Sequence, residues 1–201
     1  PPPGAAAVLR HSVRRLALAD AVIADSESTR RDLATLAGIE PTCVDVIYPG
    51  INYPYRPDPA TREPARRRLH LPAGLLLLHV GHTSFYKNVE CCLEVLRRVR
   101  AGGLDAHLVR AGRKMTPEQD ALAQRLGAAG AVHDLGPVSA EDLADLYRSC
   151  DVFLFPSLYE GFGWPPLEAM ASGLPVVCSS AGSLPEVVGE AALVADASDA
   201  T

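Results

Sequence analysis

Two glutamates that flank a glycine-rich segment are the residues of this sequence best suited to chemistry. Glu160 and Glu168 are separated by seven residues, and Gly161 and Gly163 lie between them. Carboxylates only accept hydrogen bonds, which suits them to the hydroxyl groups of a sugar, and glycines let a ligand approach the backbone. A simpler interpretation exists for each acid: Glu168 could complement a helix dipole, and Glu160 could be a solvated loop residue. The spacing alone favours neither interpretation.

The same segment predicts a strand end, a loop and a helix start in immediate succession. Pro165 and Pro166 suit the first turn of a helix, where a missing N–H costs little. We expect Leu167 and Glu168 to supply the first free amides of that turn. In open α/β sheets ligands bind outside the carboxyl ends of the strands, and a helix N-terminus attracts anions. This segment is therefore the predicted ligand site.

Short apolar runs alternate with amphipathic stretches from Leu75 onward, which predicts a parallel sheet wrapped by crossover helices. The runs are almost continuously apolar, as in strands that are covered on both faces. We therefore predict the α/β class with a Rossmann-like, doubly wound parallel sheet. Its strands are expected at residues 75–80, 106–111, 131–135, 152–155, 175–178 and 191–194.

Helical periodicity occupies the intervals between those runs. Apolar residues recur at helical spacing over residues 89–99, and Ser139 opens a sequence of capping-box form before a second helix. The first fifty residues show a smaller version of the same alternation. Its helices are expected at residues 5–19 and 28–37, and its strands at residues 22–24 and 44–47.

Composition and charge exclude several classes of protein. The net charge is −5, and the basic residues form no long block that could follow a nucleic-acid backbone, so nucleic acid is not an expected partner. The longest uncharged stretch, residues 169–185, contains glycines and a proline and makes a poor membrane span. The first residues lack the basic start of a signal peptide, so a cytoplasmic location is expected. The five cysteines have no C-x-x-C spacing, and neither a disulfide framework nor a metal site is predicted.

The segment from Glu160 to Val177 is similar to the E-x7-E motif of the retaining glycosyltransferases of family 4, whose GT-B fold has two Rossmann-like domains. Five further segments resemble family positions and follow the family's order. They are residues 19–30, 46–51, 80–88, 146–157 and 181–186. The resemblance implies the C-terminal half of a GT-B fold, preceded by the end of the N-terminal domain.

The resemblance also implies a donor site for a nucleotide diphosphate sugar of the GDP-mannose or UDP-glucose type. Glu168 would bind the ribose hydroxyls. Glu160 and Lys87 are the expected catalytic residues: Glu160 would contact the transferred hexose or stabilise its cationic transition state, and Lys87 would neutralise the diphosphate, so no metal or other cofactor is expected. The other expected donor-binding residues are Gly81, His82, Gly161, Phe162, Gly163 and Leu167, together with Val138 in the loop 136–138 that would face the base.

His82 departs from the family pattern. Many relatives have an arginine at this position, five residues before the lysine, whereas a neutral histidine donates a single hydrogen bond. Diphosphate binding would then be weaker, or shared with Thr83 and Ser84. Among the remaining histidines, His79 lies in a buried strand pattern and is expected to pack in the core.

The predicted organisation has three parts. Residues 1–50 would be the last elements of an N-terminal acceptor domain, 51–69 a linker rich in proline and charge, and 70–201 the donor-binding domain. A two-domain enzyme of this fold needs roughly 300 to 400 residues. We therefore expect a missing acceptor domain, and an isolated chain that binds donor but is inactive as a transferase. Apolar surface uncovered on the N-terminal part would favour a homodimer.

Two other functions stay open at the level of sequence. The chain could be a non-catalytic nucleotide-binding module that works beside a partner chain, which His82 and the short length slightly favour. It could also be a sugar-nucleotide epimerase or a phosphorylase on the same fold, although nothing marks the pyridoxal-phosphate lysine that a phosphorylase needs. The base, the sugar, the acceptor and the oligomeric state do not follow from the sequence.

Overall fold

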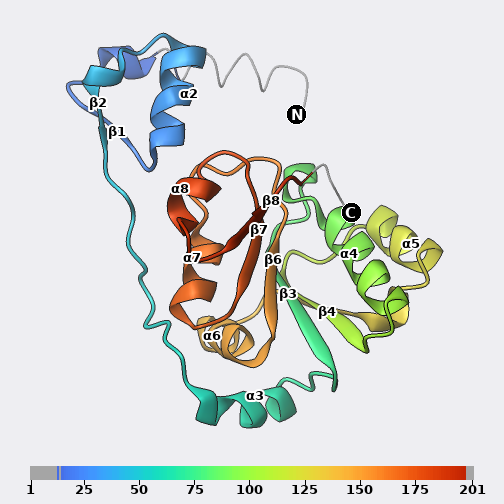
Figure 1. Ribbon diagram of the computed structural model, residues 1–201. Helices are drawn as coiled ribbons and strands as arrows, with labels where there is room; N and C mark the ends of the chain where they lie inside the picture. The colour runs from blue at the N-terminus through green and yellow to red at the C-terminus, as the bar shows by residue number, and fades with distance from the viewer. Residues whose placement is uncertain (1–12, 14, 198–201) are drawn as a thin grey trace. The chain divides into compact units, whose positions relative to one another are not determined.

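The structure is a computed structural model that describes residue 13 and residues 15–197 (Figure 1). The chain divides into two compact units, with the boundary between Gly50 and Ile51. Of the helix expected at residues 5–19, residues 5–12 and 14 lie outside the described residues, and the 3-10 turn η1 occupies Leu16–Leu18.

The first unit contains a short parallel pair of strands, β1 (Val22–Ala24) and β2 (Val44–Val46), connected through α2 (Glu27–Ala37) and the 3-10 turn η2 (Pro41–Cys43). The side chain of Ser26 accepts a hydrogen bond from the amide of Thr29 at 2.9 Å and so caps α2. The helix ends at Gly38, which adopts the left-handed conformation that glycine tolerates. The elements expected at residues 22–24, 28–37 and 44–47 are present within one residue.

The second unit contains a six-stranded parallel sheet with the order β5-β4-β3-β6-β7-β8. The predicted α/β class and doubly wound sheet are confirmed. The strands are β3 (Leu75–Gly81), β4 (Ala106–Gly112), β5 (Val132–Gly136), β6 (Val152–Phe155), β7 (Val176–Ser179) and β8 (Leu193–Ala195). Each lies within two residues of its expected bounds, and the bounds of β6 are those predicted.

The strand order reverses direction between β3 and β6. From β3 the chain first proceeds through β4 to β5, and then returns to the other side of β3 to form β6. Leu77 of β3 pairs with Val152 of β6, and Leu75 of β3 pairs with Ala106 of β4. This is the strand order of a Rossmann fold, in which ligands bind at the carboxyl ends of the two strands that flank the reversal. The topology therefore points to the loops that follow β3 and β6.

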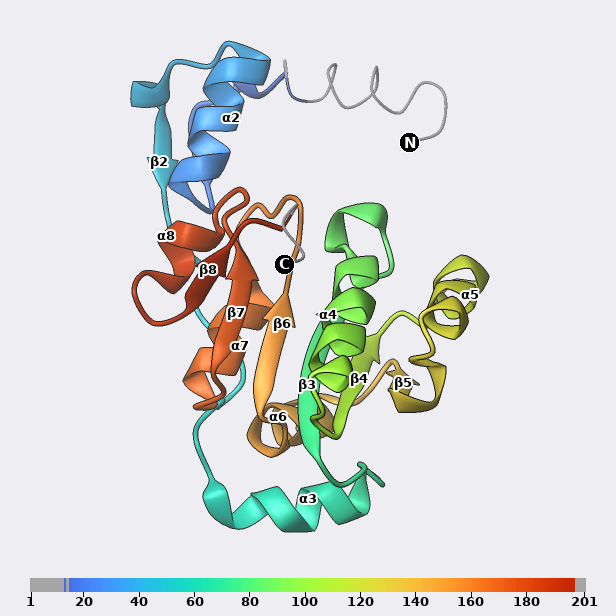
Figure 2. The same cartoon turned by 45° about the vertical axis from the view of Figure 1, so that its right-hand side comes forward.

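Helices cover both faces of this sheet (Figure 2). On one face α4 and α5 pack on a core that includes Leu77, Leu93 and Leu108, and on the other face α6, α7 and α8 enclose Leu78, Phe153 and their neighbours. The helices are α4 (Val89–Ala101), α5 (Pro117–Arg125), α6 (Ala140–Ser149), α7 (Trp164–Ala171) and α8 (Leu184–Val188), and short 3-10 turns lie at η4 (Phe85–Lys87) and η5 (Ala129–Ala131). Among the described residues no helix is long and apolar enough to cross a membrane.

The segment 51–69, expected to be a linker, differs from that expectation in its second half. It holds the 3-10 turn η3 (Pro59–Thr61) and the helix α3 (Arg62–Arg68), which packs against α6. Arg62 and Arg66 both pair with Asp151, and the contact between Arg66 and Asp151 measures 2.9 Å. Pro64 lies in the first turn of α3, where proline is tolerated, so this proline does not break the helix. The segment is an integral part of the second unit.

Candidate functional site

Lys87 and Glu160 form an ion pair at the carboxyl edge of the sheet. Lys87 ends η4, in the loop after β3, and Glu160 lies in the loop after β6. Lys87 Nζ donates to Glu160 Oε1 at 2.6 Å, and the two side chains are 11% and 12% exposed. The ammonium group also lies 4.9 Å from the centre of the Phe155 ring. The structure therefore brings together the two expected catalytic residues, at the strand reversal.

Ser183 holds the glycine loop that carries Glu160. Its hydroxyl donates to the carbonyl of Glu160 at 3.1 Å and to that of Phe162 at 2.6 Å, and its amide also donates to Glu160. Gly182 lets the two segments approach, because an added Cβ there would collide with the Glu160 carbonyl. The sequence placed residues 181–186 in the family pattern, but gave no sign that Ser183 supports this loop, since the contact is tertiary.

Gly163 connects the loop to α7. Its φ is +108°, and an added Cβ would lie 2.7 Å from Leu184 Cδ2, so glycine is required for two reasons. Gly163 is the N-cap of α7, and Trp164 is the first helical residue. The Trp164 side chain is 38% exposed, and its ring lies 6.4 Å from that of Phe162, which is buried.

The expected free amides at Leu167 and Glu168 are not supported by the bounds of α7. Leu167 is the fourth residue of the helix, and the amide at that position bonds the carbonyl of the N-cap residue, here Gly163. Proline occupies the second and third positions. In this first turn the prolines have no N–H, and the Leu167 amide is used by the helix. The amide of Trp164 is therefore the one available to a ligand. Leu167 itself is half-buried in the first turn.

Glu168 lies on α7, where its carboxylate accepts a hydrogen bond from the hydroxyl of Tyr147 at 2.8 Å. The hydroxyl of Tyr55 interacts with the same carboxylate and, like that of Tyr147, acts to lower its pKa. Burial raises the pKa of Glu168 above its usual value, and the two phenols partly counteract that rise. The sequence identified Glu168 but missed both tyrosines, because Tyr147 lies in the helix predicted after Ser139 with no local sign of a polar role, and Tyr55 lies in the expected linker.

Gly81 ends β3 beside the ion pair, and His82 follows it. An added Cβ at Gly81 would lie 3.7 Å from the aliphatic carbons of Lys87, which shows how closely the lysine stem approaches the strand end. The side chain of His82 is exposed. His79 is fully buried, as its strand pattern predicts, and its Nδ1 lies 3.1 Å from the carbonyl of Leu154. Burial lowers the pKa of His79 to about 3, so its ring is neutral at physiological pH.

The loop after β5 lies beside a second basic group. Gly136 has a left-handed φ of +76°, and an added Cβ would lie 2.9 Å from Lys114 Cε. Lys114 Nζ donates to the carbonyl of Asp134 at 2.6 Å. Val138 packs against the core on the face of α6, α7 and α8. The family resemblance predicted that Val138 faces the nucleotide base, but it did not predict that Lys114 lies beside the loop 136–138.

Two hollows open at this edge of the sheet. One, of about 510 Å³, adjoins the pair of Lys87 and Glu160 and is lined by Phe85, Tyr86, Tyr159, Glu160 and Gly161. The other, of about 410 Å³, is polar and lies beyond the ends of β3 and β4. Its lining residues are Thr83, Ser84, Arg113, Lys114, Met115, Thr116 and Pro117. Aromatic side chains thus line the hollow beside Glu160, and basic side chains line the polar hollow.

Comparison with known proteins identifies the family. The family model described as glycosyl transferases group 1 matches residues 74–201. The chain belongs to the group 1 glycosyl transferases. A D-inositol 3-phosphate glycosyltransferase of Geodermatophilus obscurus is 35% identical over 180 residues, which is 84% of this chain and 40% of that protein. The O-antigen chain mannosyltransferase B of Escherichia coli is 55% identical over 78 residues, 39% of this chain and 20% of that protein.

Solved structures agree on the architecture of this group 1 glycosyl transferase chain. Anabaena Alr3699/HepE in complex with UDP and glucose has a TM-score of 0.83 at 24% identity, covering 95% of this chain and 55% of that one. Sucrose-phosphate synthase from Thermosynechococcus elongatus has a TM-score of 0.79 at 26% identity, covering 96% and 49%. The predicted GT-B identity of the fold is confirmed. This chain spans about half the length of these neighbours.

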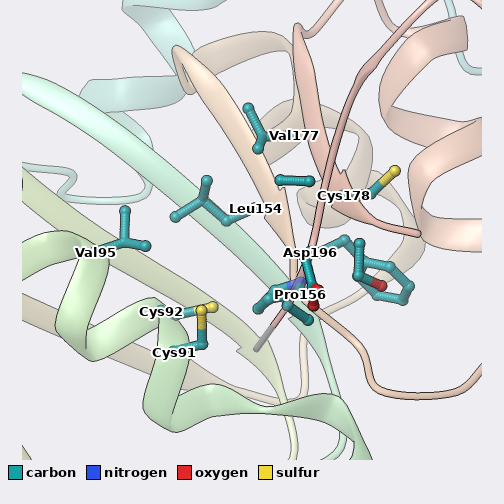
Figure 3. Close-up of a pocket in the computed structure, with 12 residues that line it drawn as sticks. Cys91, Cys92, Val95, Leu154, Pro156, Val177, Cys178 and Asp196 are labelled. Atoms are coloured by element: carbon teal, nitrogen blue, oxygen red, sulfur yellow. The ribbon is translucent and has the colours of Figure 1, made fainter. Parts of the chain in front are cut away.

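A third hollow in this glycosyl transferase lies on the α4 face of the sheet, over β6 and β7 (Figure 3). It has a volume of about 80 Å³, and Leu154, Val177 and three cysteines are among its lining residues, whereas Lys87, Glu160 and Glu168 are not. Burial raises the pKa of Cys178 to about 11, so its thiol stays protonated and is a poor nucleophile. This apolar hollow has no part in the candidate site.

Within residue 13 and residues 15–197 of this glycosyl transferase, no three histidine, cysteine, aspartate or glutamate side chains are grouped so as to hold a metal ion. The expectation that donor binding needs no metal stays a prediction.

Proposed function

We propose that this chain supplies the donor site of a retaining glycosyltransferase, which transfers a hexosyl group from a nucleotide diphosphate sugar of the GDP-mannose or UDP-glucose type. The observation that carries this proposal is the buried pair of Lys87 and Glu160, 2.6 Å apart between the ends of β3 and β6. The strand reversal of a Rossmann-like sheet is where such folds bind nucleotides. The acceptor would bind to a part of the protein outside this chain.

The chemistry of the transfer suits these two groups. When the bond to the anomeric carbon breaks, negative charge develops on the diphosphate and positive charge on the sugar ring. An ammonium group fixed in a poorly solvated site stabilises the first, and a carboxylate stabilises the second. Lys87 and Glu160 neutralise one another in the structure, and a bound donor would place its diphosphate beside Lys87 and its sugar beside Glu160. The amide of Trp164 at the start of α7 would bind a phosphate or sugar oxygen.

The hollow beside Glu160 supports the placement of the sugar. Its volume of about 510 Å³ falls within the range of about 300–1,000 Å³ that is usual for small-molecule sites. One neighbour in the fold, Anabaena Alr3699/HepE, has been crystallised with UDP, with UDP and glucose, and with UDP-glucose, and one relative is an O-antigen chain mannosyltransferase. These descriptions support a nucleotide diphosphate sugar as the class of donor.

The polar hollow contains basic side chains that supply positive charge in place of an arginine at position 82. Thr83 and Ser84 line that hollow together with Arg113 and Lys114. We propose that these basic residues supply the positive charge for the nucleotide that an arginine at position 82 would carry. A homodimer through the first unit, a partner chain and a cytoplasmic location stay predictions.

Isothermal titration of the chain with GDP, UDP, GDP-mannose and UDP-glucose tests the proposal. We expect saturable binding of one nucleotide family, weakened at least about tenfold by Lys87→Met, a loss of about 1.4 kcal/mol. Arg125→Met, which removes an exposed positive charge at the end of α5, is the matched control and should leave binding unchanged. Binding of equal strength by the Lys87 and Arg125 variants would rule out the assigned site.

A further inference from the structure

The carboxylate of Glu168 is held by two tyrosines from different parts of the second unit. The hydroxyl of Tyr147 donates to Glu168 Oε2 at 2.8 Å. The hydroxyl of Tyr55 also interacts with this carboxylate. The rings of Tyr55 and Tyr147 meet edge to face, with centres 5.6 Å apart. The two phenols therefore form one packed unit around the carboxylate.

The surroundings fix the positions of both tyrosines. Tyr147 is 1% exposed on α6, and its ring packs 5.6 Å from that of Phe153 in the sheet. Tyr55 precedes η3, and its ring lies 5.2 Å from that of Tyr53. A tyrosine has few rotatable bonds, so packing of the ring also locates the hydroxyl. The carboxylate of Glu168 is consequently oriented by the core rather than by solvent.

The hydrogen-bonding capacity of Glu168 is not exhausted by these contacts. An ionised carboxylate has about four acceptor sites on its two oxygens. Tyr147 occupies one of them and Tyr55 lies beside the carboxylate, so at least two remain for a ligand. A pair of neighbouring hydroxyl groups needs two acceptors. Burial, followed by the charge of Glu168, raises the pKa of Tyr55 to about 12, and burial also raises that of Tyr147, so both phenols stay protonated donors at neutral pH.

We propose that Tyr147 and Tyr55 are positioning residues for Glu168, which hold its carboxylate as an acceptor for the two neighbouring hydroxyls of a nucleotide ribose. This inference rests on the proposed function, because it assumes that a nucleotide binds at this edge of the sheet. It adds two residues to the site that act on the ligand only through Glu168. One of them, Tyr55, comes from the segment just after the boundary between the two compact units.

The proposal is tested by comparing GDP with 2′-deoxy-GDP, and UDP with 2′-deoxy-UDP, in titrations of the full 201-residue chain. The unmodified chain should prefer the ribonucleotide about five- to tenfold, the effect of one good hydrogen bond. Tyr147→Phe should reduce that preference at least about threefold, and Tyr55→Phe should reduce it less. Tyr53→Phe removes a neighbouring phenol that does not contact Glu168 and should keep the full preference.

A pH series separates positioning from a general structural role. The phenols lower the pKa of Glu168 against the effect of burial, so loss of the Tyr147 hydroxyl should raise that pKa. Ribonucleotide binding by Tyr147→Phe should then weaken at a higher pH than binding by the unmodified chain. Damage to the fold alone would weaken both nucleotides equally and leave the pH of half-maximal binding unchanged, and this result would overturn the proposal.

Failure of the proposal and failure of the proposed function are distinguishable. If Glu168→Gln abolishes the preference for ribose while Tyr147→Phe and Tyr55→Phe both keep it, the donor site stands and the positioning role is wrong. If Glu168→Gln keeps the preference, Glu168 does not bind ribose, and the proposal falls with that assignment. If the unmodified chain binds none of the four nucleotides, the proposed function and the inference are both wrong. Should Tyr147→Phe fail to fold, Tyr55→Phe decides, and an unchanged preference in that variant overturns the proposal.

Discussion

Lys87 and Glu160 lie on loops that follow different strands, yet their charged atoms meet at 2.6 Å with both side chains almost fully buried. A buried charge that loses its partner costs more than a pair that is removed together. Lys87→Met should therefore destabilise the chain by roughly 2 kcal/mol, because Glu160 would be left unpaired.

Thermal unfolding by circular dichroism measures that loss. The double variant Lys87→Met/Glu160→Gln removes both charges and should recover at least half of the lost stability. A double variant that is as unstable as the sum of the two single variants would show that the pair is not coupled.

Gly163→Ala should destabilise the second unit by about 1–3 kcal/mol, since alanine is strained at a φ of +108° and its Cβ would press on Leu184. The urea midpoint measures this effect. Gly130→Ala is the matched control, because no atom lies within 4 Å of an added Cβ there. Similar midpoints for the two variants would contradict the assigned geometry of the loop.

His79 predicts a pH dependence of stability. Its pKa in the folded chain is about 3, below the ordinary 6.5, so the unfolded chain binds this proton more readily between those values. The free energy of unfolding should fall by about 2 kcal/mol between pH 7 and pH 5 on account of this group. His79→Gln should flatten the dependence in urea titrations, while His70→Gln, at an exposed position, should preserve it. If the free energy of unfolding changes equally with pH in both variants, His79 is not buried in its neutral form.

Asp151 predicts a second loss of stability at lower pH. Burial acts to raise its pKa, but the amide of Leu76 and the guanidinium of Arg62 outweigh burial and lower the pKa below 3.8. A carboxylate with a lowered pKa stabilises the fold above its unfolded pKa, and this stabilisation is lost as the pH falls through the folded value. Asp151→Asn should lower the urea midpoint at pH 7 and reduce its further fall below about pH 4. Asp20→Asn, at an exposed position, is the control, and its urea midpoint should equal that of the unmodified chain at pH 7 and below about pH 4.

The sheet was predictable from the sequence because buried parallel strands are apolar over their whole length. Residues 152–155 are such a run, and the structure has β6 at those residues. The start of α7 was also predictable from the two prolines after the glycine loop. These features depend on local sequence, which a single chain displays directly.

The contacts that complete the candidate site were not predictable in this way. Ser183 and Tyr147 reach Glu160 and Glu168 across more than twenty residues, so their roles exist only once the sheet has assembled. The helix α3 was not predicted because prolines in residues 51–69 favour a linker in the local pattern, although Pro64 occupies the first turn of the helix. Arg62 and Arg66 of this helix pair with Asp151, a tertiary partner that local patterns do not reveal.

Trp164 gives the proposed donor loop an optical reporter of its own. It is the sole tryptophan of the chain, and it opens α7 directly after Gly163 with 38% of its surface exposed. Indole emission excited at the red edge of the absorption band therefore arises from this one point. Occupancy of the loop can be followed by quenching or by a spectral shift, without attaching a dye.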